Sequence, residues 1–322
     1  MVKIKPFSAL RPPRQIAKQV SARPYDVMNS AEAKAEAGEK SLLHITKPEI
    51  DFEPVIDEHS QQAYDKAVEN FKKWQERGWL VQDDGEKYYI YAQTMNGRTQ
   101  YGLVACASVD DYLEGRIKKH ELTRRDKEED RMMHVRIQDA NVEPVFFACP
   151  DVPEMNDIVK KITDAQTPEY DFVSDDGFGH RFWTIDGAAV TERITEIFAD
   201  IPAMYVADGH HRSAAAALVG QEKRRANPGH TGNEEYNYFM AVIFPESHLK
   251  IMDYNRVVKD LNGLSPAQFL EKLHASFDVA EKGIVVYRPA GLHNISMYLA
   301  GRWYSLTAKP GACDDRDPVG RL

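Results

Sequence analysis

The stretch of sequence that decides the fold is residues 87–109, KYYIYAQTMNGRTQYGLVACASV. It holds two aromatic and β-branched runs, residues 87–95 and 98–109, on either side of Asn96-Gly97. This dipeptide readily takes the positive φ angles of a two-residue turn, and both runs have strand composition. The stretch therefore predicts an antiparallel hairpin.

On the N-terminal side of the hairpin, residues 58–79 carry apolar side chains at helical spacing: Tyr64, Ala67, Val68, Phe71 and Trp74. This spacing predicts an amphipathic helix, which Gly78 is expected to end. Residues 5–48 contain repeated X-Pro steps that favour extended structure and loops over helix. Only a short helix near residues 31–37 is expected there.

On the C-terminal side, helices and strands are mixed without a regular strand–helix–strand alternation. Helices are expected at residues 110–136, 156–164, 188–198, 209–225 and 265–276, the last with Ser265 as its N-cap. Strands are expected at residues 142–148, 179–185, 203–207, 236–244 and 249–257, and a second hairpin at residues 293–307 turns at Ala300-Gly301. This order predicts an α+β protein with mixed sheets and packed helices.

Composition and charge limit the classes of function. The chain has 322 residues with 43% hydrophobic side chains, and 41 Lys plus Arg against 50 Asp plus Glu give a net charge of −9. Such a chain is expected to be a folded soluble protein, and its acidic balance disfavours nucleic acid as a partner. Its 3 cysteines form no CxxC, which favours neither a disulfide framework nor a zinc site, and the expected location is the cytoplasm. The sequence shows no signal peptide and no long apolar run, so nothing in it indicates a membrane role.

The segment most informative about chemistry is residues 205–217, YVADGHHRSAAAA. A hydrophobic strand ends at Asp208-Gly209, and an Ala-rich helix follows. Its first turn carries His210, His211 and Arg212. Free backbone N–H groups, an Arg fork and two imidazoles at a helix N-terminus suit a phosphate, and Gly209 permits close backbone approach. A capped loop with surface histidines is the alternative interpretation.

A second basic segment is residues 118–131, KKHELTRRDKEEDR. On a helix, spacings of 4, 3 and 4 would align His120, Arg124, Lys127 and Arg131 in one cationic stripe. The stripe could hold a polyphosphate, with Glu121 as a general base or metal ligand. An ordinary solvated helix face with i,i+4 ion pairs is the alternative.

Other segments carry weaker signals. In residues 23–27, Asp26 could orient a hydroxyl or a cation, or simply cap a turn. A metal-dependent hydrolase would draw on His120, His180, His210 and His211. It is the least favoured alternative, because neighbouring imidazoles lie about 100° apart on a helix and the sequence has no HExxH. P-loop, Rossmann and GxSxG motifs are also absent from the sequence.

Five ordered segments together resemble the bacterial and archaeal domain of unknown function 1015 family. They are KPFSALRP at residues 5–12, ARPYDV at 22–27, SLLHITKPE at 41–49, KKHELT with Asp130-Arg131 downstream, and ADGHHR at 207–212. The resemblance covers essentially the whole chain. It implies kinship with the ParB/sulfiredoxin-like superfamily and with an archaeal ADP-dependent free-serine kinase. The implied fold is a ParB-like α+β core with an N-terminal lobe that contains the hairpin.

The resemblance also implies one family domain, residues 1–322, made of two intimately packed lobes at roughly 1–140 and 141–322. Two departures from the family pattern are expected to matter. Family chains usually continue for several dozen residues beyond residues 316–322, so a C-terminal segment that contributes to the site is expected to be missing here. Members usually carry Tyr after HHR, whereas this chain has Ser213.

These observations and the resemblance lead us to expect phosphoryl transfer between a nucleotide or other small phosphorylated metabolite and a small hydroxyl compound such as serine. The enzyme would be a kinase-like phosphotransferase that uses ADP or ATP with Mg²⁺. The expected phosphate- or nucleotide-binding residues are Gly209, His210, Arg212, Lys119, His120, Arg124 and Arg131. The expected catalytic residues are Glu121 as base, Asp208 as Mg²⁺ or hydroxyl partner, and His211. A non-catalytic, nucleotide-responsive ParB-like regulator is the alternative.

Overall fold

A hairpin of two long strands lies inside the main sheet. β4 (Tyr88–Met95) and β5 (Arg98–Ser108) pair in antiparallel register, from Tyr89 opposite Val104 to Met95 opposite Arg98. The turn has φ angles of 52° at Asn96 and 75° at Gly97, which the Asn-Gly dipeptide accommodates. The hairpin expected from the sequence is confirmed.

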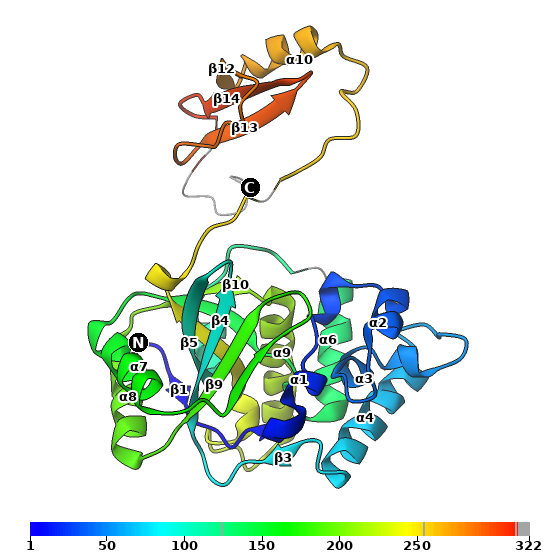
Figure 1. Ribbon diagram of the computed structural model, residues 1–322, viewed down its shortest axis with the longest axis vertical. Helices are drawn as coiled ribbons and strands as arrows, with labels where there is room; N and C mark the ends of the chain where they lie inside the picture. Colours follow the sequence, from blue (N-terminus) through cyan, green and yellow to red (C-terminus); the bar gives the residue numbers. More distant parts are fainter. Residues whose placement is uncertain (124, 254, 313, 315–322) are drawn as a thin grey trace. The chain divides into compact units, whose positions relative to one another are not determined.

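The computed structural model describes residues 1–123, 125–253, 255–312 and 314, and the chain divides into two compact units, Met1–Lys250 and Ile251–Leu322. Within the described part of the first unit, nine strands form one mixed sheet (Figure 1). Its order is β6-β10-β7-β11-β5-β4-β9-β8, and β1 also pairs with β5. The further strands are β1 (Ile4–Lys5), β6 (Ile117–Lys118), β7 (Val145–Cys149), β8 (Tyr170–Val173), β9 (Gly179–Ile185), β10 (Met204–Asp208) and β11 (Tyr238–Pro245).

Strand direction in this sheet is mostly antiparallel. The exceptions among the described strands are the pairs β6/β10 and β7/β11, which are parallel. β10 and β7 run antiparallel to each other, so the two parallel pairs point in opposite directions. The protein is therefore α+β, as expected from the sequence.

Three helices cover one face of the sheet: α7 (Pro153–Ala165), α8 (Ala188–Asp200) and α9 (His210–Ala226). Their buried apolar side chains share one core with residues of β4, β5, β7, β9, β10 and β11. The fit of α9 depends on Gly220, because a Cβ there would lie 2.5 Å from the Tyr236 carbonyl oxygen. The opposite face carries a smaller cluster around Tyr89 and Phe244, covered by Phe7 and Ala9 of the N-terminal segment.

The N-terminal helices pack as a separate group beside α6 (Figure 1). They are α1 (Ala17–Val20), α2 (Ser30–Glu36), α3 (Leu43–Thr46) and α4 (Gln61–Glu76), and α6 spans Arg125–Gln138. Val20, Ile45, Trp74 and Leu80 form their core. β2 (Leu10–Arg11) and β3 (Val81–Gln82) add a two-stranded sheet. The helices predicted near residues 31–37 and 58–79 are confirmed as α2 and α4.

The second unit is a small module with a thin core. α10 (Pro266–Leu273) begins with a capping box in which Ser265 and Gln268 bond each other's backbone N–H groups. β12 (Phe277–Gly283), β14 (Arg302–Ala308) and β13 (Asn294–Leu299) form a three-stranded antiparallel sheet in that order. The predicted hairpin is confirmed, with positive φ at Ala300 and Gly301.

The helix predicted at residues 110–136 is wrong in its first half. The chain forms α5 (Val109–Leu113), turns at Gly115 with φ 76°, and enters β6 before α6 begins at Arg125. Ile117 is fully buried in the sheet core and pairs opposite Met204, which outweighs the helical propensity of its charged neighbours. His120 therefore lies in a loop rather than on a helical stripe with Arg131. Arg124 lies outside the described residues.

The strand predicted at residues 249–257 is also not observed in its described part, since residues 249–253 and 255–257 are irregular. Ile251 and Val257 are almost fully exposed. Apolar composition alone does not make a strand when no neighbour pairs with its backbone. The predicted lobe boundary near residue 140 falls inside the first unit, between α6 and β7, whereas the two units divide after Lys250.

Candidate functional site

Strand pairing brings the two basic segments of the sequence together. β6 and β10 are parallel, with Ile117 opposite Met204 and Lys118 opposite Tyr205. Because carboxyl ends of parallel strands meet at one edge of a sheet, the residues after Lys118 lie beside those after Tyr205. The antiparallel pairing of β10 with β7 brings the start of β7 to the same edge. We call this edge, with the first turn of α9, the α9 edge.

The turn from β10 into α9 depends on glycine. The β10–β7 register shifts between Val206 and Asp208, a bulge that redirects the chain as it leaves the sheet. Gly209 follows with φ 90°, and a Cβ there would lie 3.2 Å from Cγ1 of Val145. Any other residue would be both strained and crowded at this position.

The first turn of α9 is basic and, among the described residues, has no side-chain cap. Within the described residues, no side chain caps the helix and its first turn contains no acidic residue. The Asp208 carboxylate instead accepts a hydrogen bond from Arg212 Nη2 at 2.7 Å. The helix dipole and the uncapped backbone N–H groups therefore favour an anion at this end.

The two histidines of this turn have different surroundings. His210 is buried, its ring centroid lies 4.4 Å from that of His120 in an edge-to-face arrangement, and its Nδ1 lies 3.9 Å from Glu121 Oε2. Burial lowers the pKa of His210, and the neighbouring His120 lowers it further. His210 Nε2 and Ser213 Oγ are buried with no hydrogen-bond partner among the described residues. His211 is half-buried at the next position along the helix.

Arg212 connects the elements of the α9 edge. Its Nη1 donates to the Pro144 carbonyl at 2.5 Å, while Nη2 donates to Asp208. The guanidinium thus holds the end of β10 against the residues before β7. A cavity of about 50 Å³ lies beside it, and its charged or titratable lining residues are Arg131, His134, Glu143 and Arg212.

Arg131 reaches this cavity from α6, which packs along α9 through ion pairs of Arg136 with Glu222 and of Lys223 with Asp139. The Arg131 guanidinium donates from Nε to Asp130 at 2.7 Å and lies 3.9 Å from the Tyr25 ring centroid. Burial raises the pKa of Tyr25 to about 12, opposed by the charge of Arg131. Arg131 is therefore held by an ion pair and a cation–π contact before any ligand arrives.

Most of the sequence-predicted site residues meet at the α9 edge: His120, Glu121, Asp208, Gly209, His210, His211 and Arg212. Arg131 borders it through the shared cavity. Lys119 is directed elsewhere, with its Nζ 4.4 Å from the Tyr112 ring centroid. His180 lies on β9, where it contacts Tyr91 and Ser174.

Sequence reasoning missed Glu143 and Pro144. Glu143 is half-buried, and burial raises its pKa, while the charges of Arg212 and Arg131 oppose that rise. The dipeptide Glu143-Pro144 lies directly before β7. Pro144 has no N–H to donate to a neighbouring strand, but its carbonyl oxygen accepts the hydrogen bond from Arg212. An acidic residue beside a Pro near a predicted strand start was the available signal, and it is weak by itself.

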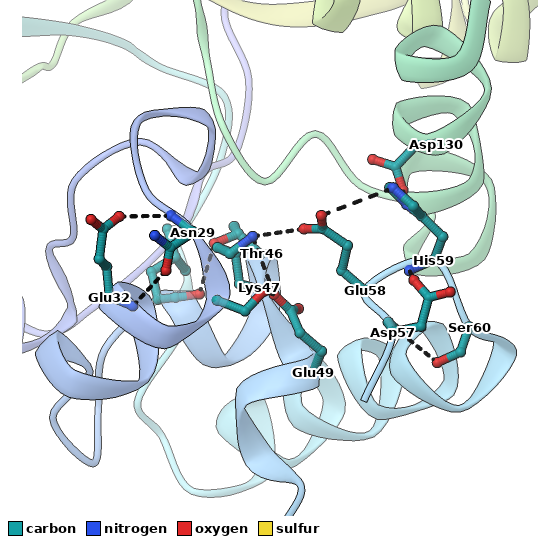
Figure 2. Close-up of polar contacts among 12 residues, drawn as sticks. Asn29, Glu32, Thr46, Lys47, Glu49, Asp57, Glu58, His59, Ser60 and Asp130 are labelled. Carbon is teal, nitrogen blue, oxygen red and sulfur yellow. Dashed lines mark hydrogen bonds and ion pairs between the residues drawn. The ribbon is translucent and has the colours of Figure 1, made fainter. Parts of the chain in front are cut away.

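A second charged group lies among the N-terminal helices, and we call it the Lys47 cluster (Figure 2). Lys47 Nζ lies 3.1 Å from Glu49 Oε1 and 2.8 Å from Glu58 Oε2, and Ser30 Oγ donates to Glu49 at 2.8 Å. The Lys47 and Glu49 side chains are only 5% and 1% exposed. This buried pair is matched internally, which is typical of a structural role.

The described residues lack two features. Within residues 1–123, 125–253, 255–312 and 314, no group of three or more His, Cys, Asp or Glu side chains is placed to hold a metal ion. Over the same residues, no helix combines the length and the apolar character needed to cross a membrane.

The comparisons with known proteins give one match. A family described as "Protein of unknown function (DUF1015)" matches residues 4–322. Neither the curated proteins nor the solved structures contain a match to this chain.

Proposed function

The chain belongs to the DUF1015 family, proteins of unknown function, and we propose that its α9 edge binds the phosphate group of a nucleotide or another small phosphorylated metabolite. The reaction proposed is phosphoryl transfer to a small hydroxyl compound such as serine. The observation that carries the proposal is the uncapped N-terminus of the 17-residue helix α9, with Arg212 and two imidazoles beside it.

Binding would use groups that the fold already holds in place. The backbone N–H groups after Gly209 would donate to phosphate oxygens, and Arg212 would supply a charged donor. Phosphate would compete with Asp208 for Arg212 Nη2, which Asp208 occupies at 2.7 Å. His120 and His210 would border the anion, while Lys119 and Arg131 would first have to leave Tyr112 and Tyr25.

In the transfer step, the acceptor oxygen would form a bond to phosphorus as the bond to the leaving phosphate oxygen breaks. Glu121 would accept the hydroxyl proton, since its carboxylate lies 3.9 Å from His210 Nδ1 and its side chain is 59% exposed to solvent, so that an acceptor could reach it. His211 and Arg212 would stabilise the charge that develops on the transferred group.

Mg²⁺ would fit this site only as part of a nucleotide complex. The Asp208 carboxylate is 62% exposed, and Mg²⁺ in phosphoryl-transfer enzymes is typically held by one or two carboxylates plus substrate phosphates and water. The ion would neutralise phosphate charge, and Asp208 would be the protein group that positions it.

Calorimetry with inorganic phosphate, ADP and ATP, with and without Mg²⁺, tests binding, and phosphorus NMR with serine as acceptor tests turnover. We expect Arg212→Gln to weaken phosphate binding at least tenfold. Arg193→Gln, in an exposed ion pair on α8, is the matched control and should leave binding unchanged. The proposal is overturned if none of the phosphorylated compounds binds to the folded protein. Binding without turnover would favour a non-catalytic regulator.

A further inference from the structure

A second cavity lies at the opposite edge of the sheet from the α9 edge. β7 and β11 are parallel, from Val145 opposite Ala241 to Cys149 opposite Pro245, and β7 runs antiparallel to β10. The carboxyl ends of β7 and β11 therefore meet where β10 begins. Such an edge, outside the carboxyl ends of parallel strands, is a frequent ligand position.

The walls of this cavity come from three sides. The sheet contributes Leu103, Cys149 and Ile243, α7 contributes Met155 and Val159, and α8 contributes Phe198. The volume is about 360 Å³, within the range of roughly 300–1,000 Å³ that holds small-molecule ligands. Val159 packs against the core but stays only partly buried, because part of its surface faces this space. We call it the α7 cavity.

The charges in the lining cancel. Lys160 and Asp164, one turn apart on α7, form an ion pair at 2.5 Å. The remaining polar lining residues are Tyr101, Asn156, Thr163 and His248. Burial raises the pKa of the Cys149 thiol to about 12, so this sulfur is an inert part of the wall.

His248 offers a directed hydrogen bond at the cavity wall. Its Nδ1 lies 3.1 Å from the Tyr101 backbone nitrogen and 3.3 Å from the Tyr101 carbonyl oxygen, so the Tyr101 backbone holds this side of the ring. His248 Nε2 has no hydrogen-bond partner among the described residues and can therefore meet one polar group of a ligand.

We propose that the α7 cavity binds an uncharged, largely apolar small molecule, with aromatic compounds bearing a single hydrogen-bonding group as the best-matched class. The enclosure on three sides, the volume, the apolar walls and the cancelled charges carry this inference. It is independent of the phosphate site, which lies at the other edge of the sheet.

N-phenyl-1-naphthylamine, an uncharged aromatic amine with environment-sensitive fluorescence, is a suitable probe for the full chain. We expect saturable binding at one site. We expect its sulfonated analogue 1-anilinonaphthalene-8-sulfonate, which adds one negative charge, to bind at least tenfold more weakly. Equal binding of the two probes would overturn the inference about charge.

Val159→Trp should fill the cavity and lower the probe's affinity at least tenfold. Val173→Trp, at an exposed position on β8, is the matched control and should leave it unchanged. Circular dichroism reports whether each variant folds. Hydrogen exchange of the unmodified protein gives a second readout, and bound probe should protect amides of α7 and α8. No binding, unchanged affinity in folded Val159→Trp, or protection elsewhere would each overturn the proposal.

Discussion

The Lys47 cluster and the α9 edge contain similar residue types, yet they differ in how far their charged side chains are buried and paired. In the Lys47 cluster, Lys47 and Glu49 are withdrawn from solvent and paired with each other, and Glu58 also pairs with Lys47 (Figure 2). Ser30 Oγ donates a hydrogen bond to Glu49. At the α9 edge, Asp208 and Glu121 stay largely exposed, and the first turn of α9 is uncapped. Internal pairing in a buried place stabilises a fold, whereas an uncapped helix start bordered by exposed carboxylates is suited to binding. Changing one residue at a time tests this distinction.

The largest expected effect is on the buried side of the comparison. Lys47→Met leaves the Glu49 carboxylate buried without its cation and should lower the free energy of unfolding by roughly 3–5 kcal/mol. Urea denaturation measures this. Lys34→Met removes the exposed ion pair with Glu53 and is the control, with an expected loss below about 1 kcal/mol. A loss as small as the control's in Lys47→Met would show that the cluster does not stabilise the fold.

Gly209→Ala should act on both stability and binding. The left-handed backbone costs about 1–2 kcal/mol for alanine, and contact with Val145 at 3.2 Å adds about 1 kcal/mol or more. Gly97→Ala is the matched control, because φ there is 75° but its Cβ would meet nothing within 4 Å. Calorimetry should also show weaker phosphate binding in Gly209→Ala only. Equal effects of the two variants on stability would mean that close approach to Val145 is unimportant.

His134 lies between the two regions and predicts a pH dependence. It lines the cavity beside Arg212 and contacts the Tyr64 ring at 5.2 Å between centroids. Burial lowers its pKa to about 3. The stabilisation from neutral His134 is complete above the ordinary pKa of about 6.5 and is lost as pH falls toward 3, by about 1.4 kcal/mol at pH 5.5.

Urea denaturation of wild type and His134→Phe at pH 7.5 and 5.5 isolates this contribution. The stability lost on acidification is compared between the two proteins, because other histidines also contribute to it. His180 and His210 have lowered pKa values and add to the loss, whereas Asp51 raises the pKa of His44, which opposes it. The variant should lose less stability on acidification than wild type. Identical losses would indicate that His134 accepts a proton without cost.

The smallest effect is expected from Asp208→Asn, which frees Arg212 Nη2 from its carboxylate. Exposed pairs of this kind contribute about 0.5–1 kcal/mol, so affinity for inorganic phosphate without Mg²⁺ should rise about two- to fivefold. The Mg²⁺ dependence of nucleotide binding should fall if Asp208 positions the ion. Glu222→Gln, in the ion pair with Arg136, controls for the loss of one acidic residue near α9. A drop in affinity for free phosphate would contradict the proposed competition.

The sequence predicted local elements better than long-range pairing. The hairpin at Asn96-Gly97 and the start of α9 at Gly209 follow from turn chemistry within a few residues. β6 could not be predicted in this way, because two residues show no periodicity and Ile117 becomes a strand residue only through its partner Met204. The approach of His120 and Glu121 to His210 depends on that pairing.

Other parts of the candidate site were hidden for the same reason. Glu143, Pro144 and Tyr25 contact or influence Arg212 and Arg131 from distant positions in the chain. The prediction of a cationic stripe was wrong because the turn at Gly115 and the burial of Ile117 in the sheet core interrupt the predicted helix. The spacing of charged residues within one segment does not predict which residues of other elements will contact them.

The position of β11 in the sheet has a consequence for the order of folding. β11 is the last of the sheet's strands along the chain, yet it lies between β7 and β5 and pairs with both. During synthesis, the β4/β5 hairpin can close early. β7 and the β6/β10 pair join the hairpin only through β11, so they cannot do so until residue 245 has been made. Because contacts so distant in sequence close slowly, folding of the first unit should be late and cooperative, with the open edge of β5 exposed to wrong partners in the interval.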